Sequence, residues 1–198
     1  MKTKSIALDI DGVLANFGWT WNVMANEVLG TKIPVDFEHN SWDFGGLGLT
    51  PDQIRQVWQK FDHTELAWRS VPPYEENVSA MRRYLCREQR ALVYFVTSRG
   101  DTIGDPALTQ SRDWLFDQGF HPKDFTVIVV KHSYYKPQIY RSIGIGASLD
   151  DYVPNVIGAN HIDNHKARAL SRPWNERAIE DFGVKSVSSV AGFLAEVG

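Results

Sequence analysis

The sequence predicts an α/β fold, a doubly wound (Rossmann-like) parallel sheet with a small helical cap inserted after the first strand. Continuous apolar runs at residues 91–96 and 126–130 are typical of strands that are buried on both faces. Helical patterns alternate with such runs, as they do in βαβ units that build a parallel sheet. One long segment near the N-terminus breaks this alternation, because it carries helical patterns and no strand pattern. These three observations decide the fold class.

The predicted core begins with a short apolar strand at residues 5–8, which ends at Asp9. The helix before the second strand has one apolar face, formed by Val78, Met81 and Leu85. The next helix begins after Asp105-Pro106 and ends near Gly119. Residues 143–149 predict a weaker strand, because their glycines lower strand propensity. A last helix has apolar residues at i, i+3, i+4 and i+7: Val190, Phe193, Leu194 and Val197.

The segment that interrupts the alternation is residues 17–73, which we interpret as a helical cap subdomain, so that residues 1–16 and 74–198 form the core domain. A first helical stripe, which ends at Gly30, is formed by Trp21, Met24 and Val28. A capping box with proline at the first helical position opens a second helix at Thr50-Pro51-Asp52-Gln53. The apolar face of that helix is formed by Ile54, Val57, Trp58 and Phe61.

Composition narrows the classes of function. The chain has 198 residues, 43% hydrophobic and 23% charged, as in ordinary soluble globular proteins. A net charge of −3 offers no broad basic surface, so we do not expect polymeric nucleic acid as a partner. No apolar run approaches the roughly 18 residues of a membrane span, so we expect no membrane association. The lone Cys86 cannot form an internal disulfide, which suits a reducing cytosol and predicts a cytoplasmic protein.

Polar residues follow the predicted strands, at the edge of the sheet where parallel sheets bind their ligands. They are Asp9, Asp11, Thr97, Ser98, Arg99, Asp150 and Asp151, with Lys136 in the connection before the fourth strand. Carboxylates that gather at one place repel each other unless a cation intervenes, and hard oxygen ligands suit Mg²⁺. Hydroxyl groups and a lysine beside that cation supply donors for phosphate oxygens. The sequence therefore predicts a magnesium and phosphate site at this edge.

Each of these motifs is weak when taken alone, and it is their order along the chain that carries the prediction. An Asp-x-Asp-Gly sequence usually marks a turn, and an EF-hand is a poor alternative because Gly12 comes too early and the twelfth position is no glutamate. The pair Asp150-Asp151 on its own is typical of a solvated turn. His161 and His165 have the spacing of metal ligands on a helix, but without an HExxH glutamate we interpret them as a solvated helix face.

The ordered set of motifs resembles that of the haloacid dehalogenase-like (HAD) phosphatase superfamily. The four motifs of that family match Asp9-Ile10-Asp11-Gly12-Val13, Thr97-Ser98, Lys136 and Asp150-Asp151, and the resemblance spans nearly the whole chain. Within the superfamily the chain is similar to the 5′(3′)-deoxyribonucleotidases and their phage and bacterial relatives. The segment 169–175 also resembles the Arg-Pro-Trp/Tyr-Asn strand end of such relatives. Arg99 stands where the animal enzymes commonly have proline, and Lys136 lies further from Asp150 than in those enzymes.

The resemblance implies a role for each motif. Asp9 would attack the phosphorus and form an aspartyl-phosphate, which water then hydrolyses. Asp11 would protonate the leaving oxygen and then activate the water. Thr97, Ser98 and Lys136 would hold the phosphoryl oxygens.

The same resemblance implies Mg²⁺ as the cofactor. Its ligands would be Asp9, the main-chain carbonyl of Asp11 and the acidic pair, with Asp151 the direct ligand and Asp150 its supporting partner. The cation would orient the ester and offset the charge between an anionic nucleophile and an anionic substrate.

The cap is rich in aromatic residues, which either form its own core or contact the substrate. Trp58 and Phe61 lie on the apolar face of the second helix, so we assign them to the core. Trp42 and Phe44 precede a glycine-rich stretch and fit no helical pattern, which favours stacking on a base. We expect the substrate-binding residues to be Phe17, Trp42, Phe44 and Arg99.

These observations predict a phosphatase for nucleoside monophosphates, in particular 5′-deoxyribonucleotides, acting as a monomer or homodimer. One alternative is a phosphatase of the same fold for another small phosphate monoester, such as a sugar phosphate. Another is a catalytically idle relative that only binds a nucleotide. Intact aspartates at positions 9, 11 and 151 argue against the idle relative, because a binding module needs no nucleophile.

Overall fold

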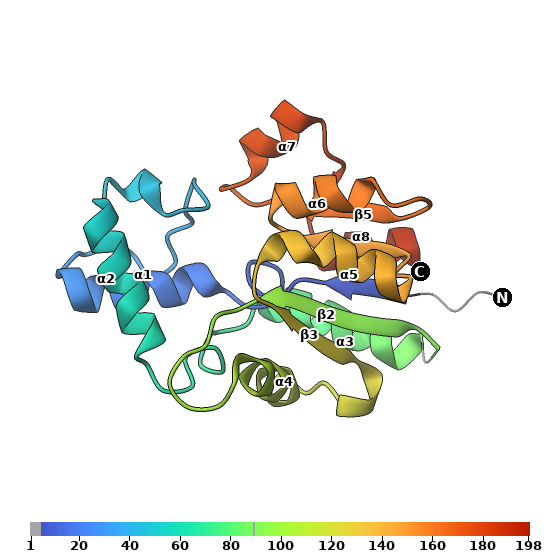
Figure 1. Cartoon of the computed structure of the whole chain (residues 1–198), viewed down its shortest axis with the longest axis horizontal. Helices are drawn as coiled ribbons and strands as arrows, with labels where there is room; N and C mark the ends of the chain where they lie inside the picture. The colour runs from blue at the N-terminus through green and yellow to red at the C-terminus, as the bar shows by residue number, and fades with distance from the viewer. Residues whose placement is uncertain (1–4, 89) are drawn as a thin grey trace.

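The computed structural model describes residues 5–88 and 90–198, and a parallel sheet with helices on both faces forms its centre (Figure 1). The strands are β1 (Ser5–Leu8), β2 (Leu92–Ser98), β3 (Thr126–Val130), β4 (Ala147–Asp150), β5 (Lys166–Leu170) and β6 (Ser186–Val187). Their order in the sheet is β3-β2-β1-β4-β5-β6. The order reverses beside β1, which pairs in parallel with both β2 and β4. The predicted doubly wound α/β fold is confirmed.

Alternate side chains of the central strand enter two separate apolar layers, because successive strand residues point to opposite faces. Ile6 and Leu8 pack in one layer, and Ala7 packs in the other. The first layer is covered by α3 (Glu75–Arg87), α4 (Ala107–Asp117) and α8 (Val190–Val197). The second is covered by α5 (Lys136–Ile143) and α6 (Val153–Asn160), and α7 (Glu176–Phe182) follows β5. The sheet is therefore buried on both sides, as its apolar strands require.

The predicted strand at residues 143–149 is wrong in its first half. Residue 143 instead ends α5, and Gly144 terminates that helix with a left-handed φ of 72°. Strand β4 begins only at Ala147. The apolar run is thus divided between a helix and a strand, because the glycine adopts a conformation that stops the helix at low cost.

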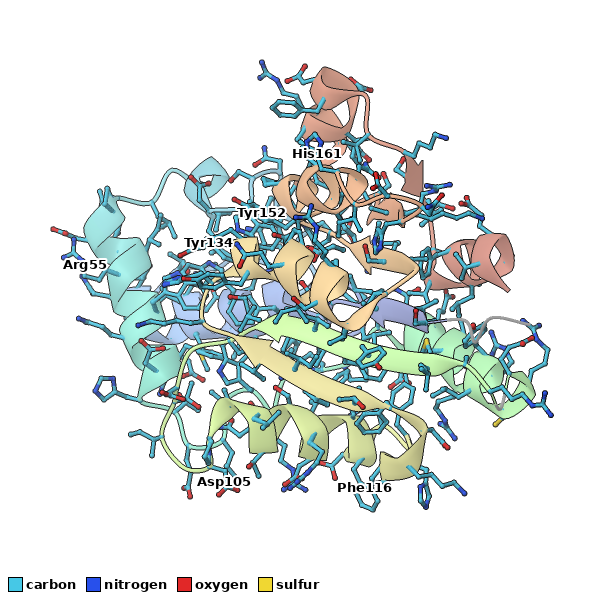
Figure 2. The ribbon with its side chains drawn as sticks, turned by 45° about the vertical axis from the view of Figure 1, so that its right-hand side comes forward. Arg55, Asp105, Phe116, Tyr134, Tyr152 and His161 are labelled. Atoms are coloured by element: carbon cyan, nitrogen blue, oxygen red, sulfur yellow. The ribbon has the colours of Figure 1, made fainter. Side chains whose placement is uncertain are left out.

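The cap lies between β1 and α3, and it consists of α1 (Phe17–Leu29), η1 (Gly45–Leu47) and α2 (Pro51–Asp62). The predicted capping box is present: Gln53 N donates to Thr50 Oγ1 over 3.3 Å, and Thr50 N donates to Gln53 Oε1 over 2.9 Å. Helix α1 ends at Gly30, as predicted. Arg55 projects outwards from α2 (Figure 2), so the apolar face of this helix is left to pack inside the cap.

Two neighbouring segments join the cap to the core. Asn16 N donates to Pro72 O over 2.7 Å, and Tyr74 N donates to Leu14 O over 2.7 Å. The chain therefore enters and leaves the cap at one place, at the carboxyl end of the sheet. Within the described ranges, no helix has both the length and the apolar character needed to cross a membrane.

Candidate active site

Three buried aspartates meet where β1 and β4 end. Asp9 directly follows β1, Asp150 is the last residue of β4, and Asp151 comes next. One carboxylate oxygen from each lies within 4.8 Å of the others. We call these three residues the acidic cluster. It forms beside the point at which the strand order reverses, where sheets of this kind bind ligands.

Lys136, at the start of α5, is the ammonium that faces the acidic cluster. Its Nζ lies 2.7 Å from Asp9 Oδ2 and 2.9 Å from Asp150 Oδ2, and its side chain is only 1% exposed. Burial alone would lower the pKa of Lys136, but the carboxylates of Asp150 and Asp9 raise it above its ordinary value. Lys136 is therefore protonated and draws two of the three aspartates together.

One ammonium does not balance three buried carboxylates. Burial raises the pKa of Asp9 from 3.8 to about 7, although Lys136 opposes the shift. Burial, followed by the charges of Asp9 and Asp150, also raises the pKa of Asp151 well above its usual range. The cluster thus has an excess of negative charge that a bound cation would relieve.

The remaining donors show which aspartate has a free oxygen. Each oxygen of Asp150 has a donor, because besides Lys136 Nζ it accepts from Tyr152 N over 2.9 Å and from Asn155 Nδ2 over 3.0 Å. Asp151 Oδ2 accepts from Trp174 Nε1, whereas Asp151 Oδ1 is buried without a hydrogen-bond partner. Oxygen ligands with an unsatisfied buried atom among them suit Mg²⁺, so the residues present fit this cation.

Gly12 is required by the packing of this site. Its φ is +73°, and a Cβ atom built on it would lie 2.0 Å from Asp151 Oδ2. Any larger residue would be strained and would also displace the Asp151 carboxylate. The turn that carries Gly12 is closed by two main-chain bonds of 2.8 Å, from Leu14 N and Ala15 N to Ile10 O.

Asp11 is held by donors from β2 and from the residue after it. Arg99 Nε and Nη2 each donate to one Asp11 oxygen over 2.8 Å, and Thr97 Oγ1 donates over 3.2 Å. The Arg99 side chain is fully enclosed, with Nη1 donating to Ser111 Oγ and the guanidinium 4.7 Å from the centre of the Trp68 ring. In this arrangement Arg99 and Thr97 therefore contact the second aspartate of the motif.

A cavity of about 180 Å³ lies between cap and core, and we call it the cap–core cavity. Its polar floor includes Asp11, Ser98 and Asp151. Its aromatic walls are formed by Phe17, Trp42, Phe44, Trp58, Trp68 and Trp174. The acidic end and the aromatic walls together suit a ligand with an anionic group on a flat or apolar body.

The three aromatic residues expected at the substrate all line this cavity, but they differ in their packing. Phe44 stacks on Trp21 at 4.0 Å, and Phe17 stacks on Trp58 at 5.3 Å, so both also belong to the core of the cap. Trp42 is 47% exposed, and its ring lies 4.7 Å from that of Tyr152. Tyr152 projects from the core on the side of the cap (Figure 2).

Several residues at the site escaped the sequence prediction. Trp58, which we had assigned to the core alone, is half-buried and lines the cavity, while Phe61 is fully buried as expected. Trp68 comes from a segment without a motif, whereas Trp174 lies in the Arg-Pro-Trp-Asn segment, to which the sequence analysis assigned no role at the site.

His39, another cavity residue, was also missed. Its ring is buried against Phe44, and burial lowers its pKa to about 4 although a backbone hydrogen bond to Gly18 opposes the shift. The imidazole is therefore neutral at pH 7.

His161 is exposed as expected, but His161 and His165 do not share a helix face. Helix α6 ends at Asn160, and His161 caps it (Figure 2). The ring of His165 bonds Ser148 Oγ and Ile145 O, each over 2.8 Å, and so links the loop before β5 to β4.

Comparison with known proteins finds similar folds among solved structures. No protein-family model and no curated protein matches the chain. A haloacid dehalogenase-like hydrolase from Bacteroides fragilis aligns over 97% of this chain and all of its own, with a TM-score of 0.61 and 13% identity. A hydrolase from Streptococcus pneumoniae TIGR4 aligns over 91% and 100%, with a TM-score of 0.55 and 15% identity. CbbY from Rhodobacter sphaeroides, in complex with phosphate, covers 99% of both chains with a TM-score of 0.53 and 15% identity.

The chain therefore shares the α/β fold of these solved structures. In this fold the acidic cluster, Lys136 and the Asp11–Arg99 pair all gather at one end of the sheet, beneath the cap. The residues that carried the sequence resemblance thus meet in space, although they lie far apart along the chain.

Proposed function

We propose that this protein is a Mg²⁺-dependent phosphatase for nucleoside monophosphates, in particular 5′-deoxyribonucleotides. The observation that carries the proposal is the buried acidic cluster held by Lys136, whose member Asp151 lines an aromatic cavity together with Asp11. A buried carboxylate beside an ammonium provides a nucleophile next to a phosphate-binding group. The core domain, residues 1–16 and 74–198, supplies the chemistry in this proposal, and the cap, residues 17–73, supplies the contacts to the rest of the substrate.

Asp9 is the nucleophile. Its Oδ2 is held by Lys136, and its Oδ1 accepts from Ile10 N over 2.7 Å, so the carboxylate has a fixed orientation. Attack on phosphorus forms an acyl–phosphate bond and breaks the bond to the ester oxygen, which leaves with a proton. Water then hydrolyses the aspartyl-phosphate and releases inorganic phosphate. Lys136 remains protonated throughout and offsets the charge of the phosphoryl group, as does Ser98 by donating from the cavity floor.

Asp11 is the acid and base in this proposal, because it lines the cavity two residues after the nucleophile. It gives a proton to the leaving oxygen and later accepts one from water. Arg99 and Thr97 hold its carboxylate in the present arrangement, so the role requires Asp11 to give up Thr97 for the ester oxygen while Arg99 keeps the carboxyl group oriented. Thr97 then becomes available to the phosphoryl oxygens.

Asp9 and Asp151 would hold Mg²⁺, together with the main-chain carbonyl of Asp11, while Asp150 orients Lys136. When bound, the cation supplies positive charge that offsets the repulsion between the nucleophile and the phosphate. Asp151 Oδ1 has no donor, whereas both oxygens of Asp150 accept hydrogen bonds, and this supports Asp151 over Asp150 as the ligand.

Aromatic walls support a nucleoside as the leaving group. A base offers a π-face on which an aromatic ring stacks, worth about 1–3 kcal/mol per base. A sugar phosphate offers hydroxyl groups instead, and these need polar partners that the walls of the cavity supply sparsely.

Phosphate release should be measured across ribonucleoside and deoxyribonucleoside monophosphates and sugar phosphates, with Mg²⁺ and with chelator. We expect the highest kcat/KM for a deoxyribonucleoside monophosphate, and no turnover in chelator. Asp9→Asn keeps the shape of the side chain but removes the nucleophile, so it should lose about 10⁴-fold or more in kcat. Hydrolysis by Asp9→Asn at the wild-type rate would refute the nucleophile, and a preference for sugar phosphates would refute the substrate class.

A further inference from the structure

The loop between β5 and α7, residues 171–175, contacts Asp151 of the acidic cluster and is held by several hydrogen bonds. Asn175 is buried, and its Nδ2 donates to Leu170 O over 2.8 Å and to Asp151 O over 2.6 Å. Asn175 Oδ1 accepts from Arg172 N over 2.9 Å. Arg172 Nε donates to Gly12 O over 2.9 Å, so the same loop is also hydrogen-bonded to the turn that carries Gly12. These bonds fix the position of the residue between them, Trp174.

The Trp174 indole holds one oxygen of Asp151. Trp174 Nε1 donates to Asp151 Oδ2 over 3.0 Å. The Asp151 carboxylate is also confined from the side of Gly12, where there is no room for a Cβ atom. With Oδ2 held in this way, Oδ1 is the buried oxygen that has no partner. The indole N–H therefore determines which oxygen of Asp151 is left for another ligand.

The same indole is also part of the aromatic wall of the cap–core cavity. The Trp174 side chain thus contacts the Asp151 carboxylate, which has an oxygen free to bind a cation, and also lines the cap–core cavity, which would hold the body of the substrate. Its two contacts use different parts of the residue, because the N–H meets Asp151 and the ring lines the cavity. A substitution that removes only the N–H can separate them.

We propose that Trp174 is a positioning residue that acts through Asp151, with its N–H orienting this carboxylate for Mg²⁺ and its ring walling the substrate cavity. The proposal rests on the magnesium site of the proposed function. Groups that orient a metal-ligating side chain by a hydrogen bond typically contribute 10- to 100-fold to metal affinity. Without the N–H, Asp151 Oδ2 loses its donor, and the carboxylate loses the contact that keeps Oδ1 free.

The decisive measurement is Mg²⁺ affinity of the metal-free full-length protein by isothermal titration calorimetry, which does not depend on turnover. Trp174→Phe removes the N–H and keeps an aromatic ring, so we expect the Kd for Mg²⁺ to rise about 10- to 100-fold. At saturating Mg²⁺ its KM for a nucleoside monophosphate should stay within about threefold of wild type. Trp174→Ala removes the ring as well, and it should raise both the Kd for Mg²⁺ and this KM by about fivefold or more.

Trp114→Phe is the matched control. Trp114 is a buried tryptophan of α4 whose Nε1 donates to Val71 O, away from the acidic cluster. The Trp114→Phe variant also loses an indole N–H hydrogen bond. It should therefore have a lower melting temperature but an unchanged Kd for Mg²⁺. An equal loss of Mg²⁺ affinity in both variants would show a general effect of destabilisation and would overturn the proposal.

A double-variant cycle tests whether Trp174 acts through Asp151. In an Asp151→Asn background, Trp174→Phe should cause no further loss of Mg²⁺ affinity. If the two residues acted independently, the fold losses of the two single variants would multiply in the double variant. A Kd for Trp174→Phe within about twofold of wild type overturns the inference. If the wild type binds Mg²⁺ and Trp174→Phe binds it weakly, but no phosphate is released, the phosphatase proposal fails and this inference stands. If the wild type binds no Mg²⁺, both fail.

Discussion

Arg99 has a different environment from the one that the sequence predicted for it. We expected it to contact the substrate, and the structure encloses it completely, with two of its nitrogens on Asp11 and its guanidinium over Trp68. Because Trp68 also lines the cavity and lies in the segment that leads out of the cap, Arg99 links the cap to the proposed acid and base.

Arg99→Lys should therefore lower kcat more than it changes KM. A lysine offers one ammonium and cannot hold both oxygens of Asp11 at once, so the carboxylate loses its fixed orientation. We expect a loss of about 10- to 100-fold in kcat, and no further loss when Asp11→Asn is already present. Steady-state kinetics of the two single variants and the double variant measure this directly.

Arg69→Lys is the control for that experiment. Arg69 forms a similar two-point contact, with Asp117, but it does so on the surface and away from the site. It should leave kcat and KM unchanged. Losses that multiply in the Arg99 and Asp11 double variant would show that Arg99 acts independently of Asp11.

Much of the acidic end of the site follows from sequence, because parallel strands bring the residues after them to one edge. That rule places Asp9, Thr97, Asp150 and Asp151 together without knowledge of the packing. It does not apply to the aromatic walls. Trp68 and Trp174 reach the cavity through contacts between distant segments, and a single tryptophan in a loop carries no pattern that distinguishes a wall from a core.

At the level of elements, the predictable part is α1 to α4, α8 and the strands with continuous apolar runs, whereas α5, α6 and α7 were not predicted. Strand β3 has the predicted bounds, whereas β5 and β6 were missed. Strand β5 carries Lys166 and Arg168 between its apolar residues, which does not resemble a strand buried on both faces, and β6 has only two residues. The Arg168 charge is met by Glu196 over 2.7 Å, a contact between distant segments that periodicity does not reveal.

The segment between α1 and α2 presents two aromatic residues whose substitution should have opposite signatures. Phe44 stacks on Trp21 and contacts His39, so Phe44→Ala should lower the melting temperature and reduce activity on every substrate. Trp42 is half-exposed and contacts Tyr152, so Trp42→Ala should leave the melting temperature almost unchanged. It should raise KM for a nucleoside monophosphate roughly five- to 150-fold, as the loss of one base stack predicts.

A phosphate ester without a base distinguishes the two effects. Trp42→Ala should hydrolyse such an ester at the wild-type rate, because Asp9 and Asp11 are unchanged. If Trp42→Ala instead loses activity equally on both substrates and melts at a lower temperature, Trp42 is a structural residue and the stacking argument fails.

The whole molecule should respond to pH through the acidic cluster. In the folded state the pKa of Asp9 is raised to about 7 from 3.8, so the metal-free fold binds a proton that the unfolded chain has released. Its contribution therefore lowers the free energy of unfolding as pH rises from about 4 to about 7, and it is constant outside that range. His39 and His165 contribute the opposite slope below pH 6.5, because burial lowers their pKa.

The difference between wild type and Asp9→Asn isolates the Asp9 contribution. Urea unfolding of the metal-free proteins should show the variant gaining stability relative to wild type as pH rises across that window. Mg²⁺ should reduce this difference by stabilising the wild type, by about 2.7 kcal/mol at 100 times its Kd. That is a rise of roughly 5–10 °C in melting temperature. If the free energy of unfolding changes with pH in parallel for the two proteins, the pKa of Asp9 is not raised in the metal-free fold.

The position of β1 between β2 and β4 also affects when the site can form during synthesis of the chain. The strand that carries Asp9 is the first of the described strands to be synthesised, but both of its neighbours in the sheet come much later in the chain. At about 5–20 residues per second, the roughly 140 residues between Asp9 and Asp151 take on the order of ten seconds to translate. For most of that interval Asp9 has neither the Lys136 ammonium nor the other two carboxylates of the acidic cluster beside it. If the proposed function is right, the nascent chain cannot hydrolyse phosphate esters until its C-terminal third has left the ribosome.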